Sequence, residues 1–343
     1  MNAKIILRST ISRLLLLSGL TAQQRCAQGR LSIATFHRVL PEAERQTYPF
    51  PGLAVTPEEL DVFLSYLKQH FDCGTLASQH ERFLSDEVTS RPFLAVTFDD
   101  GQYDNFCNAR PVLAQHQIKA SFFIPVVAVE RQELLWHDRL GFAMLTLKKQ
   151  GVAGQERLIG VLEAACMPTS DPYNLVGRVV HASKGLALQA RLHLVASVEE
   201  AAGTGLHPDY ARLMTFDEIA LLADEGHEIG SHSMTHCMMP ECDDQALDYE
   251  VAESRRILQA RLGQAIESFC YPNGNSDART AFAVAKAGYR RGITTAWGSN
   301  ERDADPFRLR RYDMVAKHVQ DAGGKFVPAL LAFRMSGFYP GLG

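Results

Sequence analysis

Residues 93–101 read FLAVTFDDG, and the rest of the chain is organised around this stretch. The mostly apolar run at 93–98 predicts a fully buried strand, because a half-buried strand would alternate with polar residues. Two adjacent carboxylates and a glycine end the strand. Two buried acids side by side are costly unless a positive charge lies between them, and a metal ion supplies such a charge.

A second polar stretch, HSMTH at 232–236, follows another apolar run. His232 and His236 are four residues apart, and a helix or a tight turn brings such a pair to one face. Together with Asp100 they make a three-ligand set that leaves room for water, as catalytic zinc sites do. Asp99 then stays free to act as a general base. Two surface histidines and a solvated Asp-Asp-Gly turn are the alternative interpretation.

Composition limits the class of protein. The 343 residues allow one large domain or two modest ones, and the 46% apolar content is ordinary for a globular protein. The net charge of −4 gives no sign of nucleic-acid binding. The seven cysteines form no C-x-x-C pair, which argues against a zinc knuckle or disulfide scaffold and favours reduced thiols in a cytoplasm.

The N-terminal segment is basic. Residues 1–30 contain five basic residues, no acid and a short apolar run at 14–20. This run is short for a signal peptide or a membrane-spanning helix. We expect a basic helix that packs either against the domain or on a membrane surface as a peripheral contact, with a signal peptide as the remaining alternative. The expected location is therefore cytoplasmic or membrane-associated.

Apolar runs predict seven strands, most of which are separated by amphipathic helices. The predicted strands are residues 31–36, 93–98, 120–124, 228–232, 267–271, 290–295 and 308–313. Strands that alternate with helices indicate a parallel sheet. Polar residues gather after four of the strands, which is where barrel enzymes carry their chemistry. We therefore predict an α/β fold with a β/α barrel of about seven strands.

Capping boxes at Thr56–Glu59 and Thr215–Glu218 predict two helix starts. Residues 130–212 hold helical patterns without a convincing strand, and we expect a helical insertion there. Further helices are expected over residues 108–117, 243–262, 277–287 and 325–335. The predicted domains are a basic N-terminal helix (1–30), the barrel (31–320) and a C-terminal helix and tail (321–343).

The pairing of TFDDG with HSMTH resembles the first two motifs of the polysaccharide deacetylase family, carbohydrate esterase family 4. Over residues 31–315, the resemblance implies a distorted (β/α)7 barrel that binds one divalent metal ion, usually zinc. It implies removal of N-acetyl groups from an acetylated polysaccharide or oligosaccharide, with release of acetate. The implied roles are catalytic base for Asp99 and metal ligand for Asp100, His232 and His236.

The third family motif, R-x-P-Y-G, reads CYPNG at 270–274, so Cys270 replaces the arginine and Asn273 the aromatic residue. The Asn273 backbone amide still suits an oxyanion donor, because that role needs no particular side chain. The group that orients Asp99 is left open between Asp277, Arg310 and Arg311, with solvated arginines as the alternative.

The family's catalytic-acid motif, L-x-H after the last strand, is absent, since LRR stands at 309–311. A permuted branch, similar to the poly-N-acetylglucosamine deacetylases, carries this histidine on the first strand. His37 follows the strand at 31–36 and fits that branch as the acid, with a core histidine as the alternative. Trp136 opens the insertion and either stacks on a sugar ring or packs in a core.

Other functions remain compatible with the sequence. The altered third motif favours a sugar-binding pseudoenzyme that keeps the metal without turnover. A metal amidase acting on a small non-sugar amide would have a narrow, closed pocket. A structural partner in a polysaccharide-assembly complex rests only on the basic N-terminus.

Overall fold

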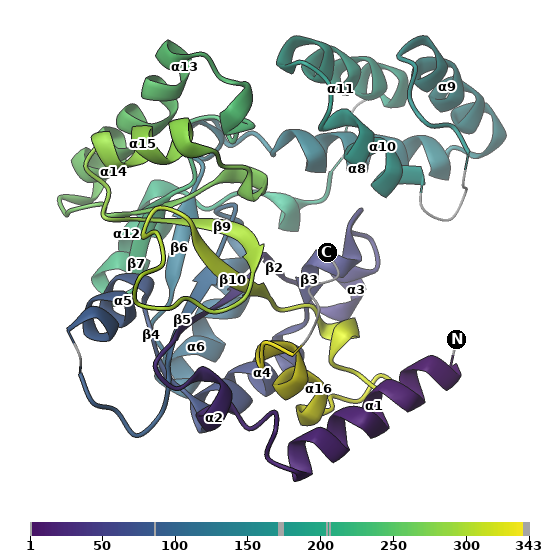
Figure 1. The fold of residues 1–343 in the computed structure, drawn as a ribbon. Helices are drawn as coiled ribbons and strands as arrows, with labels where there is room; N and C mark the ends of the chain where they lie inside the picture. The colour runs from purple at the N-terminus through teal and green to yellow at the C-terminus, as the bar shows by residue number, and fades with distance from the viewer. Residues whose placement is uncertain (1, 86, 171–174, 204, 206, 339–343) are drawn as a thin grey trace.

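The computed structural model describes residues 2–85, 87–170, 175–203, 205 and 207–338. Seven parallel strands close into a barrel with helices between them (Figure 1). The ring closes because the first strand pairs with both the second and the last of the seven. The predicted seven-stranded barrel is thereby confirmed. The end of the predicted C-terminal tail, residues 339–343, lies outside the described residues.

All seven predicted strands are present, with boundaries shifted by two residues at most. They are β1 (Leu31–Phe36), β5 (Phe93–Phe98), β6 (Ser121–Ile124), β7 (Glu228–Ser231), β8 (Ser268–Cys270), β9 (Arg291–Trp297) and β10 (Leu309–Asp313). A further short strand, β4 (Asp72–Gly74), pairs with the first half of β5, whose second half pairs with β6. Sequence patterns missed β4, because Asp-Cys-Gly contains no apolar run.

Helices cover the outside of the barrel. They are α4 (Pro57–His70), α5 (Leu76–Leu84), α6 (Arg110–His116), α7 (Val126–Arg131), α12 (Phe216–Asp224), α13 (Asp244–Asp248), α14 (Ser254–Leu262) and α15 (Ala278–Lys286). Both predicted capping boxes form, at Thr56 and at Thr215. The expected helix over 243–262 contains a π-helical turn, η5 (Tyr249–Glu253), between α13 and α14. Another π turn, η2 (Asn105–Ala109), precedes α6.

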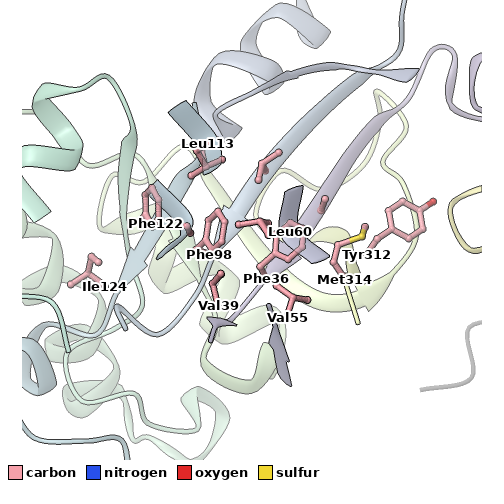
Figure 2. Close-up of a cluster of buried hydrophobic side chains, with 14 of the residues drawn as sticks. Phe36, Val39, Val55, Leu60, Phe98, Leu113, Phe122, Ile124, Tyr312 and Met314 are labelled. Carbon is pink, nitrogen blue, oxygen red and sulfur yellow. The ribbon is translucent and has the colours of Figure 1, made fainter. Parts of the chain in front are cut away.

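Side chains of each strand alternate between two cores. Outward-facing phenylalanines form a stacked row, in which the rings of Phe36 and Phe98 lie 5.4 Å apart and those of Phe98 and Phe122 5.1 Å apart (Figure 2). The barrel interior is filled by a separate cluster that includes Ile33, Ala95 and Phe123. Gly230 is needed there, because a Cβ at that position would lie 2.5 Å from the Phe123 ring.

Four helices outside the barrel form the helical insertion: α8 (Trp136–Lys149), α9 (Gly151–Ala164), α10 (Leu175–Ser183) and α11 (Leu188–Ala202). They lie together to one side of the strands (Figure 1). The insertion has a hydrophobic core of its own, built from residues such as Leu140, Leu147, Leu158 and Val195.

The chain ends lie together on another side. Helix α1 (Asn2–Leu17) packs against α16 (Pro328–Met335), near α2 (Gln23–Ala27) (Figure 1). Among the described residues, none of the helices is both long and apolar enough to cross a membrane. The remaining short elements are β2 (Arg38–Val39), α3 (Glu42–Arg45), η1 (Pro51–Leu53), β3 (Ala54–Val55), η3 (Asp209–Ala211), η4 (Met239–Glu241), η6 (Pro272–Gly274) and η7 (Ala316–His318).

Candidate metal centre and active site

The inward-facing positions of the strands continue into polar residues at the carboxyl end of the barrel. Thr35 and Thr97 lie side by side on the paired strands β1 and β5, with their Oγ1 atoms 2.8 Å apart. Two residues further on, the same faces of the chain present His37 and Asp99. Strand periodicity therefore carries the acid pair and the first-strand histidine to one opening.

A cavity of about 590 Å³ occupies this opening. All six predicted site residues line it, namely His37, Asp99, Asp100, His232, His236 and Asn273. The insertion adds Trp136, His137, Val180 and Lys184 to the wall. Residues that are far apart in the sequence are thus brought together by the closure of the barrel.

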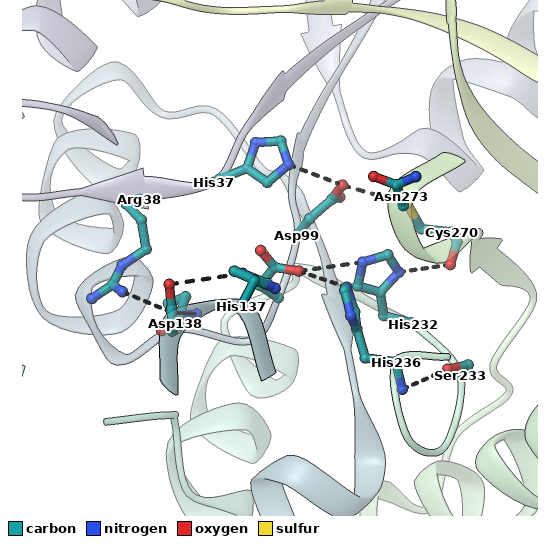
Figure 3. Close-up of polar contacts among 12 residues, drawn as sticks. His37, Arg38, Asp99, His137, Asp138, His232, Ser233, His236, Cys270 and Asn273 are labelled. Atoms are coloured by element: carbon teal, nitrogen blue, oxygen red, sulfur yellow. Dashed lines mark hydrogen bonds and ion pairs between the residues drawn. The ribbon is translucent and has the colours of Figure 1, made fainter. Parts of the chain in front are cut away.

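Asp100, His232 and His236 form a compact group of metal-ligand type. Figure 3 shows the two histidines of this group next to each other. Asp100 Oδ1 lies 3.4 Å from His232 Nε2 and 3.3 Å from His236 Nε2. A tetrahedral zinc ion with bonds of about 2.0–2.1 Å holds neighbouring donor atoms about 3.3–3.4 Å apart. The measured separations match, and one carboxylate with two imidazoles suits zinc and similar divalent ions. These side chains therefore fit a divalent metal.

The protonation states of Asp100 and His236 also suit a metal. Burial lowers the pKa of His236 to about 4, so its imidazole is neutral at physiological pH. Burial alone would raise the pKa of Asp100, but its contacts with His232 and His236 outweigh burial and hold that pKa well below the usual value. His232 Nδ1 donates to the Cys270 carbonyl over 2.6 Å, which leaves Nε2 to face Asp100. Burial would lower the pKa of His232, but its contacts with Cys270 and Asp100 outweigh burial and hold that pKa well above the usual value. Because metals bind the neutral imidazole, metal binding would displace a proton from His232.

The turn that carries the histidines is held by a buried acid that the sequence analysis missed. Glu250, in η5, accepts hydrogen bonds from the backbone amides of Met234 and Thr235, each 2.9 Å long. It also accepts the Thr235 hydroxyl over 2.6 Å. A signal was available, because Glu250 lies on the buried face of its helix between Leu247 and Val251. An acid on an apolar helix face indicates a specific partner.

The backbone at the site is strained. Asp100, Ser233 and His236 have φ values of 74°, 65° and 58°, which is the left-handed region. Such conformations cost about 1–2 kcal/mol per non-glycine residue. His236 is held in place by its backbone amide, which donates to Ser233 Oγ over 2.9 Å (Figure 3). Strain of this kind persists where surrounding contacts enforce it, which is common at functional sites.

Asp99 lies beside the ligand group with one oxygen anchored and the other free. Its Oδ2 accepts Arg311 Nη1 over 2.6 Å and lies 3.5 Å from the Cys270 thiol. Its Oδ1 is buried and has no hydrogen-bond partner among the described residues. Burial raises the pKa of Asp99, but the charges of Arg311, His232 and His37 outweigh it and lower the pKa. The carboxylate is therefore ionised and oriented.

Of the three groups considered for orienting Asp99, only Arg311 contacts it. Arg310 lies on the opposite face of β10 and is exposed. The Asp277 side chain instead caps α15, where it accepts the Thr280 backbone amide over 2.8 Å.

His37 and Asn273 flank the cavity. His37 Nε2 lies 3.8 Å from Asp99 Oδ2, and its Nδ1 lies 3.9 Å from Asp313 Oδ1. Asn273 has a left-handed backbone, with φ 56° and ψ 7°. Its side-chain oxygen accepts a hydrogen bond from Lys184, which follows α10 of the insertion.

Trp136 lies mainly in the core of the insertion, although its edge reaches the cavity. The guanidinium of Arg191 lies 5.3 Å from its ring centroid. This position favours the core alternative over a sugar platform. The neighbouring His137 ring lies closer to the metal-ligand group, 5.7 Å from that of His236.

A buried arginine that the sequence analysis passed over joins the barrel to the insertion. Arg38 Nε donates to Asp104 over 2.6 Å, and Arg38 Nη1 lies 3.5 Å from Asp138 on α8 (Figure 3). Asp138 also accepts the Tyr48 hydroxyl over 2.8 Å. This network fixes the insertion relative to the strand end that bears His37.

Comparisons with known proteins agree with this architecture. The family model described as polysaccharide deacetylase matches residues 177–292, which include His232, His236 and Asn273. YxkH of Bacillus subtilis, which carries the polysaccharide deacetylase name, is 26% identical over 117 residues. That match spans 34% of this chain and 42% of YxkH, so less than half of the curated relative is covered.

Solved structures resemble the fold over most of the chain. The deacetylase PplD of Streptococcus pyogenes, solved with acetate, superposes with a TM-score of 0.58 at 16% identity, covering 89% of this chain and 98% of PplD. IcaB of Ammonifex degensii gives a TM-score of 0.52 at 17% identity, and the superposition covers 84% of this chain and 93% of IcaB. At these identities the superpositions establish the fold alone. With the family match, the barrel and the two quoted motifs, the chain is similar to the polysaccharide deacetylase family, carbohydrate esterase family 4.

Proposed function

We propose that this protein is a metal-dependent hydrolase that removes N-acetyl groups from a polysaccharide containing N-acetylhexosamine, or from its precursor. The observation that carries the proposal is the cluster of Asp100, His232 and His236, whose donor atoms all lie within 4.8 Å of one another beside a free oxygen of Asp99. A divalent ion held by these three ligands, zinc in this proposal, would acidify a water molecule and polarise the acetamido carbonyl.

Asp99 acts as the general base. Its Oδ1 takes the proton of the attacking water, while Arg311 holds Oδ2 and keeps the carboxylate ionised. The backbone amide of Asn273 stabilises the negative charge that develops on the carbonyl oxygen. His37, partly exposed at the cavity edge, donates a proton to the leaving amine. The products are acetate and a free amino sugar.

The altered third motif does not by itself imply an inactive protein. The motif arginine is replaced by Cys270, but Arg311 from the neighbouring region of the barrel brings a guanidinium to Asp99. Burial raises the pKa of Cys270, so its neutral thiol can donate to the same carboxylate oxygen. The base is therefore oriented without the usual arginine, which supports an enzyme over a pseudoenzyme.

The shape of the site favours an extended substrate over a small amide. The cavity adjoins a larger open groove of about 1190 Å³, and Thr295 and Trp297 line both. The residues that line the cavity and the groove do not form the narrow, closed pocket that a small-amide hydrolase would need. An oligosaccharide can occupy cavity and groove together.

The decisive experiment measures acetate release from N-acetylglucosamine oligomers with and without a chelator. We expect Asp100→Ala to lose both the metal and the activity. Asp99→Asn should keep the metal and lose activity by about 10²–10⁴-fold. Asp224→Asn, at an exposed acid, is the matched control.

Each alternative gives a different result. Metal bound at full occupancy without acetate release from any acetylated saccharide would identify a pseudoenzyme. Release from small amides alone would identify an amidase. Full metal occupancy in Asp100→Ala would overturn the ligand set.

A further inference from the structure

Helix α1 is packed with its apolar face turned outward. Leu14 is 62% exposed and Leu17 84%, whereas Ser9 is 6% and Ser12 1% exposed. An amphipathic helix of a globular domain normally does the reverse, because apolar burial drives its packing. The exposed aliphatic set is Ile6, Leu7, Ile11, Leu14 and Leu17. This outward face is called the α1 apolar face below.

The α1 apolar face is one continuous stripe. Positions 7, 11 and 14 follow the spacing of four and three residues that places side chains on one side of a helix. The opposite side, with Ser9 and Ser12, packs against α16. Figure 1 shows α1 along the outer edge of the molecule, with α16 between it and the barrel. Contiguous exposed apolar surface of this kind marks an interaction site.

The charges of the same segment indicate what covers this face. Residues 1–30 carry five basic residues and no acid, although the whole chain has a net charge of −4. Arg13 is exposed on α1 beside the stripe. An apolar stripe with an exposed cation beside it, in a segment without acids, complements a surface that is apolar inside and negatively charged outside. A second copy of the chain fits less well, because self-pairing would bring these cations against one another.

We propose that α1 is a docking helix that lies on an anionic phospholipid bilayer, with Leu7, Ile11 and Leu14 inserted among the acyl chains. The position of α1 gives the contact a consequence for the proposed reaction. Helix α16 packs on the inner side of α1, and Arg334 of α16 lines the catalytic cavity. Docking therefore holds the cavity one helix layer from the membrane surface.

The test is co-sedimentation of the whole 343-residue chain with vesicles. We expect binding to mixed phosphatidylcholine and phosphatidylglycerol vesicles, weaker binding to pure phosphatidylcholine, and release by added salt. Leu7→Ser combined with Leu14→Ser should weaken binding by about tenfold or more, because it removes two inserted side chains. Arg13→Ser should weaken binding to the anionic vesicles alone by about fivefold.

The matched control is Val152→Ser combined with Leu188→Ser, which removes two exposed aliphatic side chains from the helical insertion. It should bind vesicles as the wild type does. Unchanged melting temperatures would show that the α1 variants fold. Equal binding of the α1 variant and the wild type, or no binding to anionic vesicles, would overturn the proposal. A wild-type dimer in light scattering that the α1 variant converts to a monomer, without vesicle binding, would assign the face to a second copy.

Discussion

The barrel and the helical insertion line the same cavity in different ways. The barrel contributes the buried charged groups, and each is fixed by partners far away in the sequence, such as Arg311 for Asp99. The insertion contributes a wall that is supported by a hydrophobic core of its own, with Lys184 reaching toward Asn273. The difference indicates that the barrel determines the chemistry, while the insertion positions one barrel residue and shapes access for the substrate.

The largest effect is a loss of folding stability, expected at Arg38, where the barrel and the insertion are joined. Arg38→Met removes the cation between Asp104 and Asp138 and leaves buried carboxylates without their partner. Breaking such a buried pair costs about 3–5 kcal/mol, measurable as the free energy of unfolding in urea. The control Arg110→Met removes an ion pair with Glu225 at the surface and should cost about 0–1 kcal/mol. Equal losses in both variants would contradict a structural joint at Arg38.

The next largest effect is on kcat/KM and comes from a change within the barrel. Arg311→Met should lower kcat/KM by about 10²-fold, because Asp99 loses its orienting partner. Arg311 lowers the pKa of Asp99, so its removal raises that pKa, and the acid limb of the pH profile of kcat/KM should move to higher pH. Arg310→Met, one residue away on the opposite face and without contact to Asp99, should leave the acid limb of the profile unshifted. An unshifted acid limb in Arg311→Met would remove Asp99 as the base.

A smaller effect, on metal affinity, is expected from Glu250, which supports the turn that carries the histidine ligands. Glu250→Gln turns one acceptor oxygen into a donor and weakens the bonds that hold Met234 and Thr235. Partners behind metal ligands typically contribute about 10–100-fold in metal affinity, which a competition titration with a chelator would measure. Glu253→Gln, at a surface ion pair with Arg256, is the control. If Glu250→Gln binds the metal with wild-type affinity, the turn that carries the histidines does not need the Glu250 hydrogen bonds to stay rigid.

The smallest effect, on the rate of acetate release, is expected from a change in the insertion. Burial lowers the pKa of Lys184, and its ammonium donates to the Asn273 side chain. Lys184→Met should slow acetate release by about three- to tenfold, the worth of one hydrogen bond that positions a donor. Lys149→Met, on the exposed end of α8, should have no effect. A loss as large as that of Arg311→Met would place Lys184 in direct contact with the reacting groups.

Local signals in the sequence were sufficient for the elements of the fold. Apolar runs marked strands such as β1, β5 and β6, because these strands of the closed parallel barrel are buried on both faces. Capping boxes at Thr56 and Thr215 marked helix starts, because a cap depends on residues only three positions apart. The two motifs that end β5 and β7 identified the candidate ligands and base, although their roles remain predictions.

Only the tertiary structure decided which distant groups support these residues. A strand turns neighbouring side chains to opposite faces, so the sequence implied that one of Arg310 and Arg311 points inward but not which one. The contact with Asp99 exists because the closed barrel brings together residues 212 positions apart. Likewise, nothing local indicates that α1 packs through the face with Ser9, Ser12 and Leu16, because the choice of face depends on α16 at the other end of the chain. Short-range patterns therefore determine elements, whereas long-range packing determines partners.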